Sequence, residues 1–414
     1  MYWTLLFLLG LPVSLSATTN NLQLVAKFEG ASLFTTVVGT GEKSLNVIRL
    51  HGSFHQMGRQ YGGLLGAQMQ EFYHAAVYDF LIGVKGYSYN YILQLTEWYY
   101  LYQPQHARDF ITGMAETSGL TLEEQKITAS LQNLVYFSLG CSSLMAWSDY
   151  TGGGPLVIGR NFDTPVGPFR SYAKYLNVVV YNPVGSGNSL AEVNYVGCVG
   201  FHTGMNKYGI YMDYHNGRMS DPALINRTLG EYLMFSYLLN YSSLDRIDQE
   251  FNNTLPEVGA IINVADKTKG YVYEWGTWAT KRRVVDPSYG LLVSTNHFVD
   301  PTWGGDILWV YPGATSWYTI ERRANLLARG EQFKGLLSVS WVKYIFDRTF
   351  WDSTNPGPTF PDDSNGVTII QVVAVPANLE LWVKARGYSE WQGINLRPLF
   401  FGDITPATSL LLTN

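Results

Sequence analysis

The feature that most constrains this chain is a short cysteine segment followed by a segment that carries an arginine and an aspartate. Residues 140–143 read GCSS and contain Cys141, and residues 159–163 read GRNFD. A glycine-rich turn at residues 152–154 leads into the apolar run before Arg160, so the two segments are predicted to pair as a β-hairpin. Such a hairpin would bring a thiol, a guanidinium and the Asp163 carboxylate together.

This grouping suits a cysteine nucleophile that becomes an N-terminal residue. A thiol attacks an amide as a thiolate, and a nearby guanidinium such as that of Arg160 favours this form. Gly140 leaves its carbonyl open to attack by the Cys141 thiol, so self-cleavage between these two residues is predicted. The freed α-amine, with a pKa near 7.7–8.0, could take the thiol proton, and Asp163 could orient that amine. The simpler alternative is an ordinary ion pair between Arg160 and Asp163 at a strand end.

Composition narrows the class of protein. The chain has 414 residues, of which 46% are hydrophobic and 15% charged, and its formal net charge is −5. With no acidic or basic block, the chain resembles neither a disordered protein nor a nucleic-acid partner. The length permits two domains or one large layered domain.

The N-terminus and three sequons bear on the compartment. Residues 1–16 are interpreted as a signal peptide, since their apolar run is too short to span a bilayer, and a buried N-terminal strand or helix is the alternative. Asn226, Asn240 and Asn252 begin sequons, which would mark a glycosylated surface in a eukaryotic protein and mean nothing in a bacterial one. We therefore expect a secreted, periplasmic or lysosomal-type location.

The chain contains two cysteines, Cys141 and Cys198. An exported protein could join them in a structural disulfide. The alternative is a reactive Cys141 and a packed, inert Cys198. The histidines show no compact zinc-binding spacing, so neither a metal nor a cofactor is expected.

The pattern of elements predicts the fold class. A strand is expected at residues 46–50, followed by helices to about residue 135, one of which is capped by Thr121 with Glu124 three positions later. Further strands are expected at residues 176–181, 191–196, 209–213, 259–265, 270–275, 291–295, 367–375 and 379–385, and helices at residues 229–239 and 319–328. This order predicts an α+β architecture with two sheets stacked between helical layers.

On these residues the chain resembles the N-terminal-nucleophile (Ntn) cysteine hydrolases of the penicillin acyltransferase type, relatives of the choloylglycine hydrolases and acid ceramidases. The similar motifs are the pro-segment entry at 51–62, the cleavage site at 140–143, the strand at 159–163, the turn at 204–210, the segment at 292–298 and the closing strand pair at 368–383. The resemblance implies a four-layer αββα sandwich preceded by a mainly helical pro-segment. Residues 17–140 would form the α subunit and residues 141–414 the catalytic β subunit.

The resemblance also implies site roles. Cys141 would be the nucleophile, Arg160 the stabiliser of its thiolate and Asp163 the group that orients the α-amine.

Three later residues are implied in the same way. Asn296 would donate its side-chain amide to the developing oxyanion, an interaction worth about 2.7–4 kcal/mol in comparable sites. Asn216 would be a second polar contact, and Arg322 corresponds to a further family arginine. The alternative for both asparagines is ordinary turn chemistry. Lys207 departs from the family, which usually has glutamate there.

The resulting hypothesis is a zymogen that processes itself into an amidohydrolase or acyltransferase. It would cleave a linear, non-peptide C–N amide bond of a small N-acylated substrate through a thioester on Cys141, with its own cleaved pro-segment as partner. Neither a nucleic-acid partner nor a transmembrane segment is expected. Two alternatives stay open: a cysteine protease with His202, His215 or His297 as base, and a secreted binding protein that kept the fold without catalysis.

Overall fold

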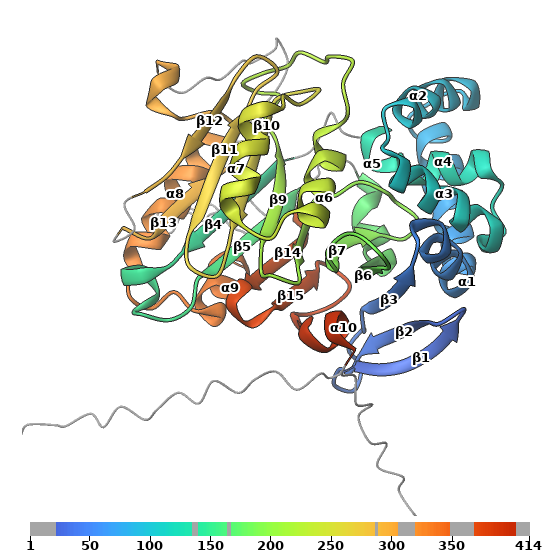
Figure 1. Cartoon of the computed structure of the whole chain (residues 1–414), viewed down its shortest axis with the longest axis horizontal. Helices are drawn as coiled ribbons and strands as arrows, with labels where there is room; N and C mark the ends of the chain where they lie inside the picture. Colours follow the sequence, from blue (N-terminus) through green and yellow to red (C-terminus); the bar gives the residue numbers. More distant parts are fainter. Residues whose placement is uncertain are drawn as a thin grey trace, which may run out of the picture.

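Two β-sheets face each other at the centre of the molecule (Figure 1). The computed structural model describes residues 22–134, 140–163, 167–285, 289–304, 319–347 and 368–402, so the signal-peptide prediction lies outside the described residues. The ten-stranded sheet has the order β1 (Leu22–Phe28), β2 (Ala31–Thr36), β3 (Asn46–Gly52), β6 (Leu176–Pro183), β7 (Leu190–Tyr195), β8 (Thr203–Asn206), β9 (Tyr211–Asn216), β10 (Ala260–Ala265), β11 (Gly270–Trp275) and β12 (Thr280–Arg283). The six-stranded sheet has the order β13 (Leu291–Ser294), β4 (Gly140–Ala146), β5 (Val157–Asp163), β14 (Thr368–Val375), β15 (Glu380–Ala385) and β16 (Gln392–Asn395).

Helices pack on the outer faces of both sheets, and some helices of the first part of the chain pack on other helices (Figure 1). They are α1 (Phe54–Tyr73), the π-helix η1 (His74–Ile82), α2 (Tyr89–Leu101), α3 (Gln105–Ser118), α4 (Leu122–Ala129), α5 (Leu131–Leu134), α6 (Gly230–Asn240), α7 (Leu244–Asn253), α8 (Thr319–Gln332), α9 (Val339–Asp347) and α10 (Arg397–Phe401). Helices α8 and α9 pack on the six-stranded sheet against β4, β5, β13 and β14. On the ten-stranded sheet, Phe251 of α7 stacks on Tyr273 of β11 with ring centroids 4.1 Å apart.

Strand β4 explains why the centre is a sandwich. All its residues are buried, and its two faces belong to different cores. Cys141 and Met145 join the large core that reaches the other sheet, whereas Leu144 and Ala146 join the core beneath α8 and α9. A strand buried on both faces requires a layer on each side. The α+β class and the stacking of two sheets between helical layers are therefore confirmed.

The N-terminal region is mainly helical, as the sequence predicts, and it also contains two strands, β1 and β2, that the sequence does not predict. Besides α1 to α5 it supplies β1, β2 and β3 to the ten-stranded sheet, and β3 runs parallel to β6. The β1–β2 hairpin turns at Glu29 and Gly30, whose φ angles of 44° and 87° suit a tight primed turn. Strand β1 is mostly exposed, so its sequence lacks a clear apolar alternation. The first part of the chain is thus built into the sheet.

Local signals read from the sequence agree with the structure where they are strong. Thr121 caps α4 and forms a capping box with Glu124, as predicted.

No helix in the described part of the chain combines the length and apolarity that a membrane span needs.

Candidate active site

Cys141 lies at the start of β4, with its side chain between the two sheets. Strands β4 and β5 form the expected antiparallel pair, in which Gly140 lies opposite Asp163 and Ser143 lies opposite Arg160. Residues on one face of a strand alternate, so Cys141 and Arg160 become diagonal neighbours. Cys141 is only 1% exposed in this uncleaved chain.

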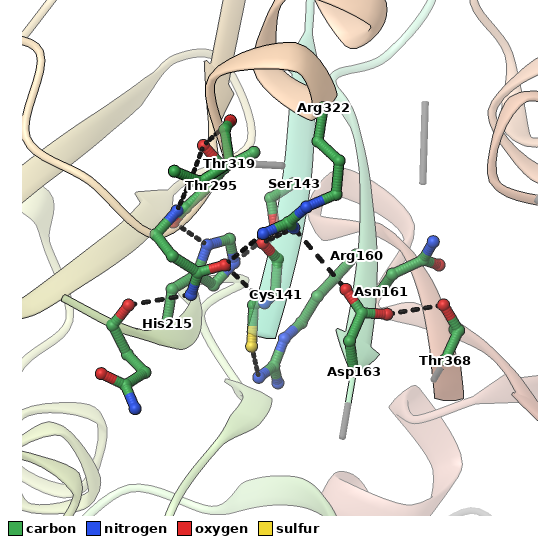
Figure 2. A network of polar contacts seen from close by, with 12 residues as sticks. Cys141, Ser143, Arg160, Asn161, Asp163, His215, Thr295, Thr319, Arg322 and Thr368 are labelled. Atoms are coloured by element: carbon green, nitrogen blue, oxygen red, sulfur yellow. Dashed lines mark hydrogen bonds and ion pairs between the residues drawn. The ribbon is translucent and has the colours of Figure 1, made fainter. Parts of the chain in front are cut away.

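The guanidinium of Arg160 lies beside the sulfur (Figure 2). Its Nη2 is 3.5 Å from Cys141 Sγ and also donates to the Tyr214 carbonyl at 2.8 Å. Its Nη1 donates to the His202 carbonyl at 2.6 Å. Carbonyl oxygens orient the guanidinium without neutralising it, so its full charge remains available to a thiolate.

The intact chain keeps the Cys141 thiol protonated. Burial raises its pKa, and Asp163 adds to this effect, while Arg160 acts in the opposite direction without overcoming it. The sulfur lies 3.8 Å from the Tyr214 carbonyl, a geometry in which the thiol donates a weak hydrogen bond. A thiolate here therefore needs a proton acceptor or greater solvation.

Asn296 and Arg322 hold the main chain of Cys141 on both sides. Asn296 follows β13, and its Oδ1 accepts the Cys141 N–H at 2.9 Å. Arg322 of α8 donates from Nη1 to the Cys141 carbonyl at 2.6 Å and from Nη2 to the same Asn296 Oδ1 at 2.7 Å. Asn296 is therefore an acceptor toward Cys141 in this chain, because two donors fix the orientation of its amide.

Asp163 is close to the site but does not contact the Cys141 nitrogen. Its Oδ1 accepts a hydrogen bond from Thr368 Oγ1 at 2.5 Å (Figure 2). Its Oδ2 lies 3.6 Å from Arg322 Nη1 and accepts no hydrogen bond from any described residue. A buried carboxylate oxygen with spare acceptor capacity thus lies opposite Gly140.

Asn216 takes part through its backbone. Its carbonyl accepts the Asn296 Nδ2–H at 2.8 Å, and its own Oδ1 accepts from the Arg218 N–H at 2.9 Å. The structure thus brings together the six residues singled out from the sequence, which are Cys141, Arg160, Asp163, Asn216, Asn296 and Arg322. Their chemical roles remain predictions.

Sequence reasoning missed several partners of this site. The carbonyls of Tyr214 and His202 orient Arg160, and a backbone group leaves no side-chain signal in a sequence. Thr319, at the start of α8, accepts the Asn296 N–H at 2.9 Å and donates to Thr295 Oγ1 at 2.9 Å. An isolated threonine far along the chain carries no motif that would have identified it.

Both cysteines are free thiols, so the disulfide alternative is wrong. Burial raises the pKa of Cys198, and the nearby carboxylates of Glu231 and Glu192 raise it further.

His202 is not placed as a general base for the sulfur. Its ring lies 3.6 Å from Glu231 Oε2, and burial lowers its pKa to about 3. Burial also raises the pKa of Glu231 to about 8, so both partners are neutral at pH 7 and the contact is not an ion pair.

The other two candidate histidines contact different residues. His215 Nε2 lies 2.9 Å from Asp213 Oδ1, and His297 Nδ1 lies 2.9 Å from Thr319 Oγ1. The polar neighbours of Cys141 Sγ are a guanidinium and a carbonyl. This geometry disfavours a cysteine–histidine dyad. Within the described ranges, no three His, Cys, Asp or Glu side chains are grouped to hold a metal ion.

A cavity of about 10 Å³ adjoins Arg160, which is room for about one water molecule. It is lined by Gln132, Arg160, Phe162, Val193, His202, Thr203, Ile370 and Val372. Gln132 belongs to α5, so the predicted pro-segment forms one wall.

Comparisons with known proteins give structural likenesses only. No protein-family model matches the chain, and no curated protein matches it. A mutant of the conjugated bile acid hydrolase from Clostridium perfringens aligns at 12% identity with a TM-score of 0.43, covering 62% of this chain and 92% of that one. An N-acylethanolamine-hydrolyzing acid amidase ortholog from Caenorhabditis elegans aligns at 15% identity and 0.40, covering 61% and 98%. Penicillin V acylase from Agrobacterium tumefaciens aligns at 11% identity and 0.42, covering 62% and 86%.

Proposed function

We propose that this chain is a precursor that cuts itself before Cys141 and then acts as a cysteine Ntn amidohydrolase or acyltransferase on a non-peptide C–N amide bond of a small N-acylated substrate. One observation carries the proposal. The Cys141 sulfur lies beside an un-neutralised guanidinium, while Asn296 and Arg322 hold the backbone nitrogen and carbonyl of the same residue. Groups converge on both the side chain and the main chain, as a residue that is to become a catalytic N-terminus requires.

Self-cleavage would proceed by attack of this sulfur on the preceding peptide bond. The Cys141 sulfur attacks the Gly140 carbonyl carbon, forming a C–S bond, and the C–N bond to Cys141 breaks as its nitrogen takes up a proton. Water then hydrolyses the thioester, leaving a carboxylate on Gly140 and a free thiol. Arg160 stabilises the sulfur as an anion during attack.

The released α-amine would act as the proton acceptor that the intact chain lacks. Asn296 Oδ1 already accepts a hydrogen bond from this nitrogen, and Asp163 Oδ2, on the residue opposite Gly140, retains acceptor capacity. An α-amine with a pKa near 7.7–8.0 can take the thiol proton near neutral pH. The thiolate then attacks the substrate carbonyl, and the ammonium returns the proton to the departing amine. Water or a second amine resolves the thioester.

The pro-segment would stay attached after cleavage. Strand β3 pairs with β6 from Asn46↔Asn177 to Gly52↔Pro183, across the two future fragments. At the other end of the segment, Asn133 Nδ2 donates to Glu231 Oε1 at 2.7 Å. Cutting one peptide bond breaks none of these contacts.

An exported, glycosylated form is part of the same proposal. Asn226, Asn240 and Asn252 are all exposed, so the three sequons are accessible to modification. Together with the predicted signal peptide at residues 1–16, this favours a secreted or lysosomal-type compartment over a cytosolic one.

Denaturing gels test the processing step. Wild type should give two fragments, the second beginning at Cys141 by N-terminal sequencing, and Cys141→Ala should give one uncut chain. Cys198→Ala is the matched control and should process like wild type. An intact wild type with an unreactive thiol would instead favour a binding protein. Intact mass after incubation with N-acylated amines and β-lactams would identify the acyl group that remains on Cys141.

The same gels separate two roles of Asn296. Asn296→Asp keeps the oxygen that accepts the Cys141 N–H but removes the amide donor, whereas Asn296→Ala removes both. If the acceptor role dominates processing, the aspartate variant should process within about tenfold of wild type and the alanine variant about 100-fold more slowly. Equal losses would instead support the oxyanion-donor role.

A further inference from the structure

A buried polar cluster lies between the sheets directly behind Cys141. Asp213 of β9 is its centre. Its Oδ1 lies 2.9 Å from His215 Nε2 and accepts from Asn263 Nδ2 at 2.6 Å. Its Oδ2 accepts from Ser143 Oγ and from the Tyr211 hydroxyl, both at 3.1 Å. Asp213 and His215 are both 0% exposed, so solvent does not screen them.

The ring of His215 is tied into the cluster through both nitrogens. Nδ1 lies 3.0 Å from the Thr295 carbonyl, which only accepts, so Nδ1 carries a hydrogen. Nε2 lies 2.9 Å from Asp213 Oδ1, 2.9 Å from Ser143 Oγ and 3.2 Å from Asn263 Nδ2. Burial raises the pKa of Asp213, but its contacts with His215, Arg160 and Asn263 together outweigh that effect and hold this pKa below its usual range.

The pair fixes the strand beneath the sulfur. Asp213 and His215 flank Tyr214 on β9, and the Tyr214 carbonyl accepts from Arg160 and faces Cys141 Sγ. A shift of this part of β9 would move the carbonyl that orients the guanidinium.

The pair also fixes the residue that holds the backbone of Cys141. His215 bonds the Thr295 carbonyl, and the next residue, Asn296, accepts the Cys141 N–H. Ser143 connects the cluster to β4 itself, two residues after the nucleophile. One buried pair thus joins the three segments that meet at Cys141.

Asp213 also acts on the thiol through its charge. Its carboxylate raises the pKa of Cys141, whereas Arg160 lowers it. The other titratable or charged groups near the thiol and the pair are Arg160 and Asp163 on β5, Arg322 on α8, Tyr211 on β9 and His202 before β8.

We propose that Asp213 and His215 are positioning residues for the Cys141 nucleophile: the pair sets the place of the Tyr214 carbonyl, which orients Arg160, and of Asn296, which holds the Cys141 nitrogen. The inference rests on the proposed function, and neither residue contacts the reacting atoms.

Three variants test the positioning role: His215→Gln, Asp213→Asn and the double variant. Each is assayed for self-cleavage and for the pH dependence of Cys141 alkylation by iodoacetamide, with the labelled peptide identified by mass. His215→Gln removes the ring that joins Asp213 to the Thr295 carbonyl, so Arg160 should be held less closely to the sulfur. Its alkylation midpoint should therefore move up by about one pH unit, with about tenfold slower alkylation at pH 7. Asp213→Asn also removes the carboxylate that raises the pKa of Cys141, so it should give no upward shift, and the double variant should lie near Asp213→Asn.

A purely structural pair would give a different pattern, in which all three variants lose thermal stability and activity together with unshifted midpoints. That result, or wild-type behaviour of His215→Gln, would overturn the inference. His106, a half-buried histidine at the interface of α3 with the ten-stranded sheet, provides the matched control: His106→Gln should behave like wild type.

A measurement on wild type covers variants that do not fold. In ¹⁵N-histidine spectra, Nδ1 of His215 should carry a proton that exchanges slowly with solvent, and a ring without a proton on Nδ1 would refute the contact with Thr295. Failure of wild type to cleave itself would instead contradict the proposed function, so the two failures can be told apart.

Discussion

The two cysteines of this chain occupy equally buried places with different neighbours. Cys141 is 1% exposed and Cys198 is 6% exposed, and burial raises the pKa of both. Beside Cys141 a guanidinium opposes that effect, whereas the carboxylates near Cys198 add to it. Burial alone makes a thiol inert, so the difference between the two sites lies in the sign of the neighbouring charge.

Removing the guanidinium of Arg160 should make the surroundings of Cys141 resemble those of Cys198. Of the predictions made here, this change should have the largest effect, and the effect is on self-cleavage. In Arg160→Gln, burial of the sulfur remains but the opposing cation is lost. Self-cleavage should slow by about 100-fold or more, as when a preorganised charge is removed from a catalytic site. The rate of fragment formation measures this.

Arg282→Gln is the matched control, since Arg282 pairs with Asp248 at 2.7 Å on the surface. It should process at the wild-type rate. Normal processing of Arg160→Gln would show that the charge beside Cys141 is not what distinguishes it from Cys198.

Sequence reasoning located the Cys141 side of this comparison because its signals are local. A turn between two apolar runs predicted the β4–β5 hairpin, and pairing then brought Arg160 and Asp163 near the sulfur. Asn296 and Arg322 came instead from the resemblance, because nothing in their spacing shows that α8 folds back over β4.

The parts of the site and fold that the sequence did not predict depend on tertiary contacts, which leave no local pattern in the sequence. The acceptors of Arg160 are the carbonyls of Tyr214, on β9 of the other sheet, and of His202, just before β8. Strand β8 was interpreted as part of a turn, because Asn206 does form that turn by accepting from the N–H groups of Tyr208 and Ile210. Helix α7 escaped notice because its polar exposed face dominates its sequence.

The carboxylates near Cys198 give a second, smaller prediction. Burial raises the pKa of Glu231 to about 8 and that of Glu192 to about 7, above the ordinary value of 4.5. Between those values the folded chain holds more protons than the unfolded chain, so these groups stabilise the fold fully below about pH 4.5 and less as the pH rises toward 8. The unfolding temperature should fall by about 5 °C or more from pH 5 to pH 8.

Glu231→Gln identifies the source of this dependence. The amide keeps the size of the side chain and cannot ionise, so the unfolding temperature should vary less with pH than in wild type. Glu250→Gln is a suitable control, since Glu250 is partly exposed and bonds the Tyr241 hydroxyl at 2.6 Å. An undiminished slope in Glu231→Gln would assign the effect to other groups.

Replacing the second cysteine should have the smallest effect. Cys198 packs after the turn that follows β7, where its thiol behaves as a small apolar group, so Cys198→Ala removes one sulfur atom from the core and should cost about 1 kcal/mol. Thiol titration of the unfolded chain should fall by one group, while self-cleavage and alkylation of Cys141 stay unchanged. A loss of processing without unfolding would mean that Cys198 acts on the site. Burial and the nearby carboxylates make a thiolate at Cys198 unfavourable. Cys198 could therefore affect the site only by changing how the core packs, and not by reacting as a nucleophile.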